Sequence, residues 1–334
     1  MPAASTFVTG GTGFLGKAVV EELLSSGRPV KALARSDSAA EALGALGAEP
    51  VRGDVLDRAS LEAGVAGCEV AYHVAGANAF CLPDPSPLYE VNVSGSRAVV
   101  LAAAAAGVRR LVYTSSAATL GEERGAAGSE DAVHRGWFLS DYERSKFEAE
   151  RAVLDAARET GLEVVCVNPS SVQGPGRTGG TARLLLGYLN GTLRSAVDTR
   201  LSVVDIADCT RGHLLAEERG RPGERYVLCG ASLTVREGLE LLGRVTGLDE
   251  QPRFLPPRLA LLLAGGVEVV GRARRRKPSV CREMVRTLLH GHTYDGSKAT
   301  RELGLVYTPL EETLRRTVAW YVQQGLVRRP LPGP

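Results

Sequence analysis

Short apolar runs alternate with segments of helical periodicity over the first half of the chain. The apolar runs at residues 5–10, 29–35, 48–54, 69–76, 109–116 and 162–169 predict six strands. Between them, apolar residues recur at helical spacing, as in residues 14–27, which end in Gly27, a residue type that often follows a helix C-terminus. Strands that alternate with helices predict an α/β fold with a doubly wound parallel sheet.

The alternation ends after Pro169. Loop-rich segments follow, and then mostly helices, which we expect at residues 179–190, 206–219, 234–246, 256–271, 279–289 and 310–324. We therefore expect a Rossmann-like, cofactor-binding domain over residues 1–170, to which some later segments return. A smaller, helix-rich, substrate-binding part would span residues 171–330 and cover the carboxyl ends of the strands, where open α/β sheets bind ligands.

A glycine-rich turn joins the first predicted strand to the first predicted helix. Residues 8–16 read VTGGTGFLG, in which Gly10, Gly13 and Gly16 have G-x-x-G-x-x-G spacing. Glycine permits a tight turn and close approach of the backbone to a pyrophosphate, and the helix N-terminus supplies N–H donors and a positive dipole end. In this context the motif predicts a dinucleotide site; a purely structural glycine turn is the alternative.

The end of the second strand indicates which dinucleotide binds. NAD-specific sites usually place Asp or Glu there to bind the ribose 2′-hydroxyl, whereas this strand ends in Arg35, followed by Ser36. A guanidinium suits a 2′-phosphate, so we predict NADP(H). The alternative is a solvated Arg35, with Asp37 in the NAD-type role. After the third strand, we expect Asp54 to accept a hydrogen bond from the adenine amino group, and Asp57 to cap a helix.

Tyr142 and Lys146 are four residues apart at the start of a predicted helix, and therefore share one face of it. The spacing alone is weak evidence, because an ordinary solvated helix can contain it by chance. Ser116, however, ends the fifth predicted strand, where such sheets place active sites. A nearby ammonium lowers the pKa of a phenol. We therefore predict that Tyr142 exchanges a proton with a carbonyl substrate, that Lys146 tunes Tyr142 and binds the nicotinamide ribose, and that Ser116 orients the substrate oxygen.

Together these motifs resemble the extended short-chain dehydrogenase/reductase family. The resemblance rests on TGGTGFLG, the strand-ending YTSS, YERSK and NPSSVQGPG, and it extends over residues 5–325. The chain is most similar to the dihydroflavonol-4-reductase-like branch, which includes bacterial proteins named as hopanoid-associated sugar epimerases of the NAD-dependent epimerase/dehydratase type. The resemblance implies that Ser116, Tyr142 and Lys146 are catalytic and that Asn92 supports the site. It also implies cofactor contacts from Gly10, Gly13, Phe14, Leu15, Gly16, Arg35, Asp54, Val55, Val74, Ala75, Tyr142, Lys146 and Pro169.

The segments expected around the substrate are apolar. Phe80 and Leu82 lie in one flanking segment, and Trp137 and Phe138 in the other, which predicts an apolar, partly aromatic wall; loop packing is the alternative for the last two. We expect substrate contacts from Asn78, Phe80, Trp137, Phe138 and Ser171. Residues 120–136 are long, polar and glycine-bearing, and predict a mobile lid.

One stretch departs from the nucleotide-sugar epimerases of the family. They commonly have an Arg where this chain has Leu201, and a His where it has Asp205. We therefore predict an NADP(H)-dependent oxidoreductase of the ketoreductase type, which reduces a carbonyl or oxidises a secondary alcohol on a mostly apolar small molecule. The alternatives are a nucleotide-sugar epimerase or dehydratase with tightly bound NAD(P), and a non-catalytic NADP(H)-sensing protein, which would not need Ser116, Tyr142 and Lys146 together.

The composition indicates which classes of partner the protein binds and in which cellular compartment it lies. A net charge of +2 predicts no strong attraction to nucleic acid or to anionic membranes. The six cysteines, at positions 68, 81, 166, 209, 229 and 281, have no metal-site spacing, so we expect no metal and interpret them as buried thiols in a reducing cytoplasm. The first residues do not have the pattern of a signal peptide. We expect a monomer or a homodimer.

Residues 259–271 form the most apolar stretch, and the basic sequence RARRRK follows it closely. The stretch is too short to span a membrane and contains Glu268. We expect a helix that packs on the core, so that membrane contact is not the favoured interpretation. The alternative is an interfacial helix over residues 256–276, held to lipid by its basic flank.

Overall fold

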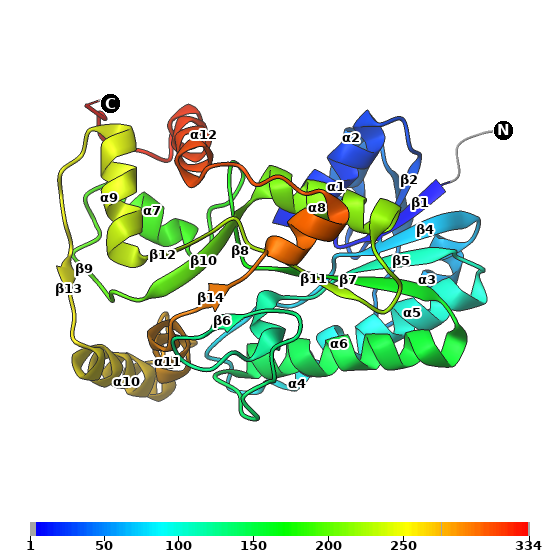
Figure 1. Ribbon diagram of the computed structural model, residues 1–334, viewed down its shortest axis with the longest axis horizontal. Helices are drawn as coiled ribbons and strands as arrows, with labels where there is room; N and C mark the ends of the chain where they lie inside the picture. Colours follow the sequence, from blue (N-terminus) through cyan, green and yellow to red (C-terminus); the bar gives the residue numbers. More distant parts are fainter. Residues whose placement is uncertain (1–4, 275, 333–334) are drawn as a thin grey trace.

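The computed structural model describes residues 5–274 and 276–332, and a seven-stranded parallel sheet lies at its centre (Figure 1). The strand order is β11-β7-β5-β4-β1-β2-β3. The strands are β1 (Ser5–Thr9), β2 (Val30–Ala34), β3 (Glu49–Arg52), β4 (Cys68–His73), β5 (Arg110–Thr114), β7 (Glu163–Pro169) and β11 (Arg225–Leu228). The predicted Rossmann-like α/β fold is confirmed, and the first six of these strands in chain order are the six that the sequence predicts.

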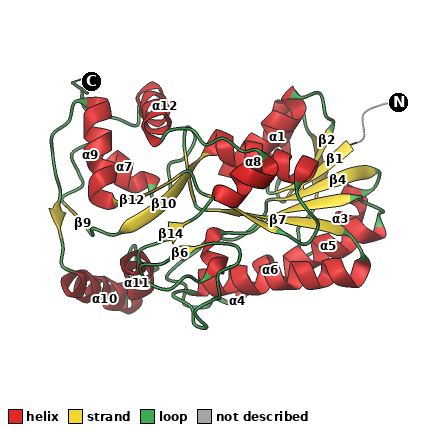
Figure 2. Cartoon of the chain, viewed as in Figure 1, coloured by secondary structure: helices red, strands yellow, loops and turns green. Residues whose placement is uncertain are grey.

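Helices cover both faces of this sheet (Figure 2). One face carries α1 (Phe14–Ser25), α2 (Asp37–Leu46) and α8 (Ile206–Arg219), and the other carries α3 (Arg58–Val65), α5 (Ser96–Ala105) and α6 (Asp141–Thr160). Neighbouring side chains of β1 pack against the helices on the two opposite faces of the sheet. Val8 packs into the first apolar cluster and Phe7 into the second, because successive side chains of a strand point to opposite faces.

Two elements of the second half complete the sheet domain. Strand β11 pairs with β7, so that Tyr226 lies beside Val167. Helix α8 packs on β7 and β5, and its Leu215 is buried in the same cluster as Val8. The parallel sheet therefore includes residues beyond position 200, while the predicted division near residue 170 stays a prediction.

The rest of the second half forms a helical layer over a small sheet. Helices α7 (Ala182–Leu189), α9 (Val235–Thr246) and α12 (Leu310–Gln323) share a core that contains Leu189, Leu239 and Tyr321. The small sheet has the order β12-β10-β8 and was not predicted; its strands are β8 (Ser171–Gln173), β10 (Arg200–Asp205) and β12 (Ala231–Thr234). The shorter elements are α4 (Ser86–Tyr89), β6 (Ala127–Gly128), β9 (Ser195–Ala196), β13 (Arg253–Phe254), β14 (Thr293–Tyr294), the π-helical turns η1 (Glu90–Gly95) and η3 (Ala299–Leu303), and the 3₁₀ turn η2 (Ala117–Leu120).

Helices α10 (Pro257–Ala273) and α11 (Arg282–His290) form a pair at the edge of the molecule, away from the main sheet (Figure 1). Ala260 and Ala264 of α10 pack against Val285 of α11. Six of the seven larger apolar side chains of α10 are exposed, and Leu261 is the exception. The expectation of a helix packed on the core is therefore wrong for most of its apolar face. In the described parts of the chain, no helix has the length and apolar character needed to cross a membrane.

The predicted lid is fastened to the second half. Strand β6 pairs with β14, and the Glu122 carboxylate lies 2.6 Å from Nδ1 of His292. Glu130 Oε1 accepts a hydrogen bond of 2.7 Å from the Val227 backbone N–H. Residues 120–136 therefore have a set of fixed contacts that the polar, glycine-bearing sequence did not indicate.

Candidate active site

The glycine turn has the shape that a pyrophosphate site needs. Gly10 has a φ of +75°, and a Cβ on it would lie 2.6 Å from the backbone nitrogen of Ala75. A Cβ on Gly16 would collide with the carbonyl oxygen of Gly10. Helix α1 begins at Phe14 without a side-chain cap, so its first N–H groups are available to an anion. These features fit the phosphates of a dinucleotide.

The end of β2 brings a second arginine to the predicted ribose site. Arg35 is exposed there, and Arg52, opposite Ala34 in the β2–β3 ladder, donates a hydrogen bond of 3.3 Å to the carbonyl of Ala34. Asp37 lies 3.5 Å from Arg52 in an ion pair. The carboxylate that could serve NAD is thus held by a neighbouring guanidinium. Sequence reasoning missed Arg52, although it ends the third strand just as Arg35 follows the second.

The other predicted cofactor residues lie at the carboxyl ends of the strands. Phe14 and Leu15 open α1, Asp54 and Val55 follow β3, Val74 and Ala75 follow β4, and Pro169 ends β7. Oδ1 of Asp54 accepts a hydrogen bond of 3.0 Å from the N–H of Leu56, and Asp57 caps α3, as the sequence suggested. The whole predicted cofactor set therefore borders one edge of the sheet.

Lys146 is held by strand β5. Ser140 caps α6, so that Tyr142 lies in the first turn and Lys146 one turn further on. Nζ of Lys146 donates hydrogen bonds to the carbonyl of Thr114 at 2.9 Å and to the hydroxyl of Tyr113 at 3.2 Å. Burial lowers the pKa of Lys146 to about 8. Its two hydrogen bonds go to β5 rather than to Tyr142.

The groups that favour the phenolate of Tyr142 are Ser116 and Arg177. Burial raises the pKa of Tyr142, while the Ser116 hydroxyl and the positive charge of Arg177 lower it. The structure therefore brings Ser116 and Tyr142 together as predicted. The charge of Arg177 also lowers the pKa of Tyr142, an effect that the sequence did not indicate.

Arg177 is the site residue that sequence reasoning missed. Its guanidinium lies 5.6 Å from the centre of the Phe14 ring, at the start of α1, and donates a hydrogen bond of 2.6 Å to the carbonyl of Val172. Burial lowers the pKa of Arg177. The residue lies just after the GPG of the family-like motif, and no spacing rule singled it out. Arg177 thus lies near the start of α1, and its charge also acts on Tyr142.

Two buried polar side chains support the site from behind. Asn92 lies in the π-helical turn η1, where its Oδ1 accepts a hydrogen bond of 2.7 Å from the Ala77 N–H and its Nδ2 donates one of 2.9 Å to Ser145. His73 lies between Thr9 and Ser96, and burial lowers its pKa to about 3, so its imidazole is neutral at pH 7. It is a packed residue of strand β4.

The predicted substrate residues do not all converge. The Phe80 ring lies 5.6 Å from that of Tyr142. Phe138 packs within its own segment, with its ring centre 5.4 Å from that of Phe147, and Trp137 lies edge-on to His290. Asn78 is exposed, and the Ser171 hydroxyl is bonded to Thr181 and Gln173. Of the predicted substrate residues, only Phe80 therefore has an aromatic ring beside Tyr142.

A cleft of about 1020 Å³ lies beside the start of α6. Leu82, Trp137 and Phe138 give it an apolar side, and Arg276, Lys277, Arg282 and Arg286 give it a basic side that the sequence did not indicate. The cleft is bounded by the segment after β4 and by α10 and α11. Its lining includes Asp141, the residue before Tyr142, but not Tyr142 itself.

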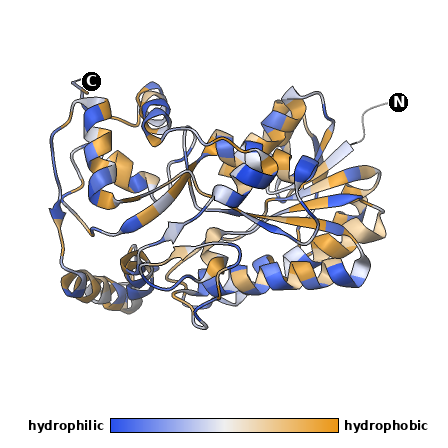
Figure 3. Ribbon diagram, in the orientation of Figure 1, coloured by the Kyte–Doolittle hydropathy of each residue, from blue (hydrophilic) through white to orange (hydrophobic). Residues whose placement is uncertain are grey.

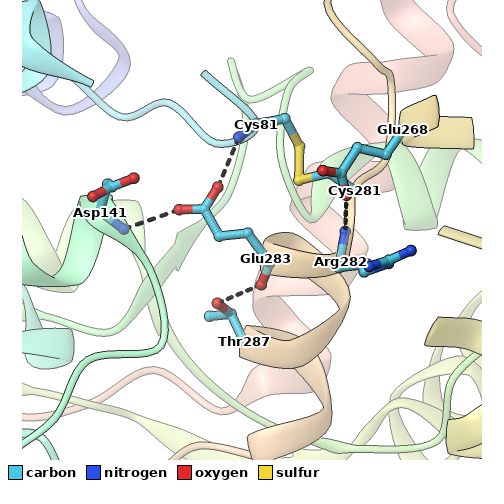
Figure 4. The surroundings of a disulfide bond; sticks show 7 residues. All are labelled: Cys81, Asp141, Glu268, Cys281, Arg282, Glu283 and Thr287. Atoms are coloured by element: carbon cyan, nitrogen blue, oxygen red, sulfur yellow. Dashed lines mark hydrogen bonds between the residues drawn. A yellow bond between two sulfur atoms is a disulfide. The ribbon is translucent and has the colours of Figure 1, made fainter. Parts of the chain in front are cut away.

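The expectation of six free thiols is wrong, because Cys81 and Cys281 form a disulfide (Figure 4). Cys68, Cys166, Cys209 and Cys229 are buried thiols, as predicted. Beside the disulfide, the Glu283 carboxylate accepts hydrogen bonds from the backbone N–H groups of Cys81, at 2.8 Å, and Asp141, at 2.9 Å. Helix α11 is thus tied to both segments that flank Tyr142. Sequence spacing could not reveal a pair separated by 200 residues.

Comparisons with known proteins identify the family of the chain. The NAD dependent epimerase/dehydratase family matches residues 6–229. A putative dihydroflavonol 4-reductase of Synechocystis sp. is 35% identical, with 96% of each chain covered. Sterol demethylase protein B of Methylococcus capsulatus is also 35% identical, with 97% of this chain and all of that one covered.

A solved structure, the crystal structure of gox2253, superposes with a TM-score of 0.84 at 32% identity, and covers 97% of this chain and 100% of that one. The glycine turn at β1 and the Ser116–Tyr142–Lys146 arrangement therefore lie in a chain that belongs to the NAD dependent epimerase/dehydratase family, within the extended short-chain dehydrogenases/reductases.

Proposed function

We propose that the protein is an NADP(H)-dependent oxidoreductase that reduces a carbonyl, or oxidises a secondary alcohol, on a mostly apolar small molecule. The observation that carries the proposal is the set of groups around Tyr142: the Ser116 hydroxyl and the charge of Arg177 lower its pKa, and the centre of the Phe80 ring lies 5.6 Å from that of its own ring. The names of two relatives, a dihydroflavonol reductase and a sterol demethylase protein, also favour a polycyclic, largely apolar substrate.

Each residue of the site would have a separate role in the reduction of a carbonyl. The nicotinamide cofactor supplies the hydride. The Ser116 hydroxyl holds the substrate oxygen, and Tyr142 donates its phenolic proton to that oxygen as the negative charge develops. Lys146, fixed by the Thr114 carbonyl, would hold the nicotinamide ribose with its ammonium. Oxidation of an alcohol reverses these proton movements.

The proposed preference for NADP(H) rests on the basic side chains at the carboxyl end of β2. Arg35 and Arg52 give two guanidinium groups there, and the nearest carboxylate, Asp37, is in an ion pair with Arg52. A 2′-phosphate would gain charge-assisted hydrogen bonds from these two guanidinium groups.

The test of the chemistry is Tyr142→Phe, assayed as NADPH oxidation with a panel of cyclic ketones. We expect kcat to fall by about 10²–10⁴-fold, while the NADPH Kd changes less than a few-fold. Tyr89→Phe is the matched control, because the Tyr89 hydroxyl bonds Asp141 next to the site at 3.1 Å without reaching the substrate oxygen. Retained turnover in Tyr142→Phe would refute the assignment.

The test of the cofactor is Arg35→Asp. We expect the NADPH/NAD preference to fall by at least about tenfold, since a carboxylate repels a 2′-phosphate and accepts from a 2′-hydroxyl. An unchanged preference in this variant would contradict the NADP(H) assignment.

The second candidate is a nucleotide-sugar epimerase or dehydratase, which the family match favours. Leu201 and Asp205 argue against it: Asp205 caps α8 and forms an ion pair of 2.7 Å with Arg316, so it is already engaged. An epimerase would retain NAD through purification and convert a nucleotide sugar without net use of NADPH. That pair of results would favour the second candidate over the first.

A further inference from the structure

Helix α10 has its small apolar residues on its buried side and most of its large ones on the opposite side. The buried side carries Ala260, Ala264 and Gly265, together with the partly buried Leu261. The other large apolar side chains face outward: Leu262 is 72% exposed, Val269 is 61% exposed and Leu263 is 52% exposed. A surface helix of a globular protein ordinarily shows the reverse arrangement, with its large apolar side chains toward the core.

The exposed apolar residues form one continuous stripe. Its members are Leu259, Leu262, Leu263, Val267, Val269 and Val270, all exposed. Their spacings of three and four residues place them on one side of the helix along most of its length. Figure 3 shows the hydrophobic residues of α10 at the periphery of the molecule. In the described parts of the chain, no other helix has six large exposed apolar side chains.

Basic residues surround this apolar stripe. Residues 253–286 contain nine arginines and lysines and two glutamates, a net charge of +7, although the whole chain has a net charge of only +2. Exposed members of this basic group are Arg258, Arg274, Arg276, Lys277, Arg282 and Arg286. Both glutamates bind backbone N–H groups: Glu268 that of Arg282, and Glu283 those of Cys81 and Asp141 (Figure 4).

We propose that α10 docks on the surface of an anionic lipid bilayer, with its apolar stripe in the boundary between headgroups and acyl chains and its basic flank against lipid phosphates. An apolar face bordered by cations is the pattern of an interfacial helix. A second copy of this chain is a poorer occupant, because it would bring two basic flanks together. The helix lies on the bilayer and does not cross it, since it has 17 residues.

The docked orientation gives the cleft a role. The cleft is bounded by α10 and α11, and its lining includes Trp137, Arg276 and Lys277. Docking would place its opening at the level of the headgroups, where an apolar substrate can enter without crossing water. This consequence rests on the proposed function, whereas the docking itself does not.

The test is flotation of the complete protein with vesicles, without substrate or cofactor, so that its result is independent of activity. We expect binding to vesicles of phosphatidylcholine with phosphatidylglycerol, at least about tenfold weaker binding to phosphatidylcholine alone, and weaker binding at high salt. Equal binding to both vesicles, or no binding to either, would overturn the proposal without touching the reductase assignment.

Two matched pairs of variants locate the binding surface. The apolar variant is Leu262→Ser/Leu263→Ser/Val269→Ser, and its control changes three exposed valines elsewhere, Val133→Ser/Val306→Ser/Val322→Ser. The basic variant is Arg274→Gln/Arg276→Gln/Lys277→Gln, and its control removes the same charge elsewhere, with Arg124→Gln/Arg211→Gln/Arg244→Gln.

Both α10 variants should bind vesicles at least about tenfold more weakly than the parent protein. In the basic variant, the loss of each cation should weaken binding by about fivefold. The controls should bind like the parent protein. Controls that lose as much as the α10 variants would overturn the proposal, because binding would then follow total charge or total apolar surface. A lipid-free dimer that the apolar variant dissociates would assign the stripe to a second copy instead.

Discussion

The charge of Lys146 should set the alkaline limit of the enzyme. Burial lowers the pKa of Lys146 to about 8, and the carboxylate of Glu150, one turn further along α6, opposes this effect. Removing that charge with Glu150→Gln should therefore lower the pKa of Lys146 further. A partner charge near a buried group is worth about one pKa unit, or about 1.4 kcal/mol, which moves the midpoint from about 8 to about 7.

The direction of the pH dependence follows because the enzyme is active when Lys146 is protonated. The ammonium is present below its pKa and lost above it, so kcat/KM should be constant at low pH and should fall above the midpoint. At pH 6 the variant and the parent protein should differ little. At pH 8 the charged fraction would be about one half in the parent and about one eleventh in the variant, a difference of about fivefold.

The assay is kcat/KM for NADPH over the range from about pH 6 to pH 9.5, because this parameter reports groups on the free enzyme. Glu148→Gln is the control: it makes the same change on the same helix, but Glu148 accepts its 2.7 Å hydrogen bond from Arg144 at the surface. Lys146→Arg should remove the alkaline decline, since a guanidinium stays charged. A midpoint unmoved by Glu150→Gln, or equally moved by Glu148→Gln, would refute the reasoning.

Three further changes test other parts of the structure. Gly10→Ala should weaken NADPH binding by at least about tenfold, because the φ of +75° and the 2.6 Å contact leave no room for a Cβ; fluorescence titration measures this. Arg177→Gln should raise the pKa of Tyr142 and so shift the rise of alcohol oxidation to higher pH, which a kcat profile would show. Replacing Cys81 and Cys281 with Ser should lower the free energy of unfolding by about 2–5 kcal/mol, measured in denaturant without reductant; equal stability would argue against the disulfide.

The sequence was informative wherever local spacing determines position. Residues 8–16 could be placed because a strand, a glycine turn and a helix occur in direct succession. Ser116 and Tyr142 could be related because the carboxyl ends of parallel strands meet at one edge of the sheet. Even the helices of the second half were found, since their apolar residues recur at helical spacing.

What the sequence could not give depends on contacts between distant segments. The Cys81–Cys281 disulfide and the Glu122–His292 contact both join the first half of the chain to its last third. Arg177 lies over Phe14 because the loop after β8 returns to the start of α1, and from there its charge acts on Tyr142. Periodicity reports which side of an element is apolar, and not which other element lies against it. The exposed stripe of α10 was misjudged for the same reason.

The return of β11 to the main sheet has a consequence for synthesis on the ribosome. Strand β7 ends at Pro169, but the strand that covers its free edge, β11, spans residues 225–228. At about 5–20 residues per second, roughly 3–12 s would pass between the emergence of the two strands. During that interval the nascent chain would present an uncovered, apolar strand edge. Slow codons placed before position 225 should therefore increase its dependence on chaperones and its tendency to aggregate.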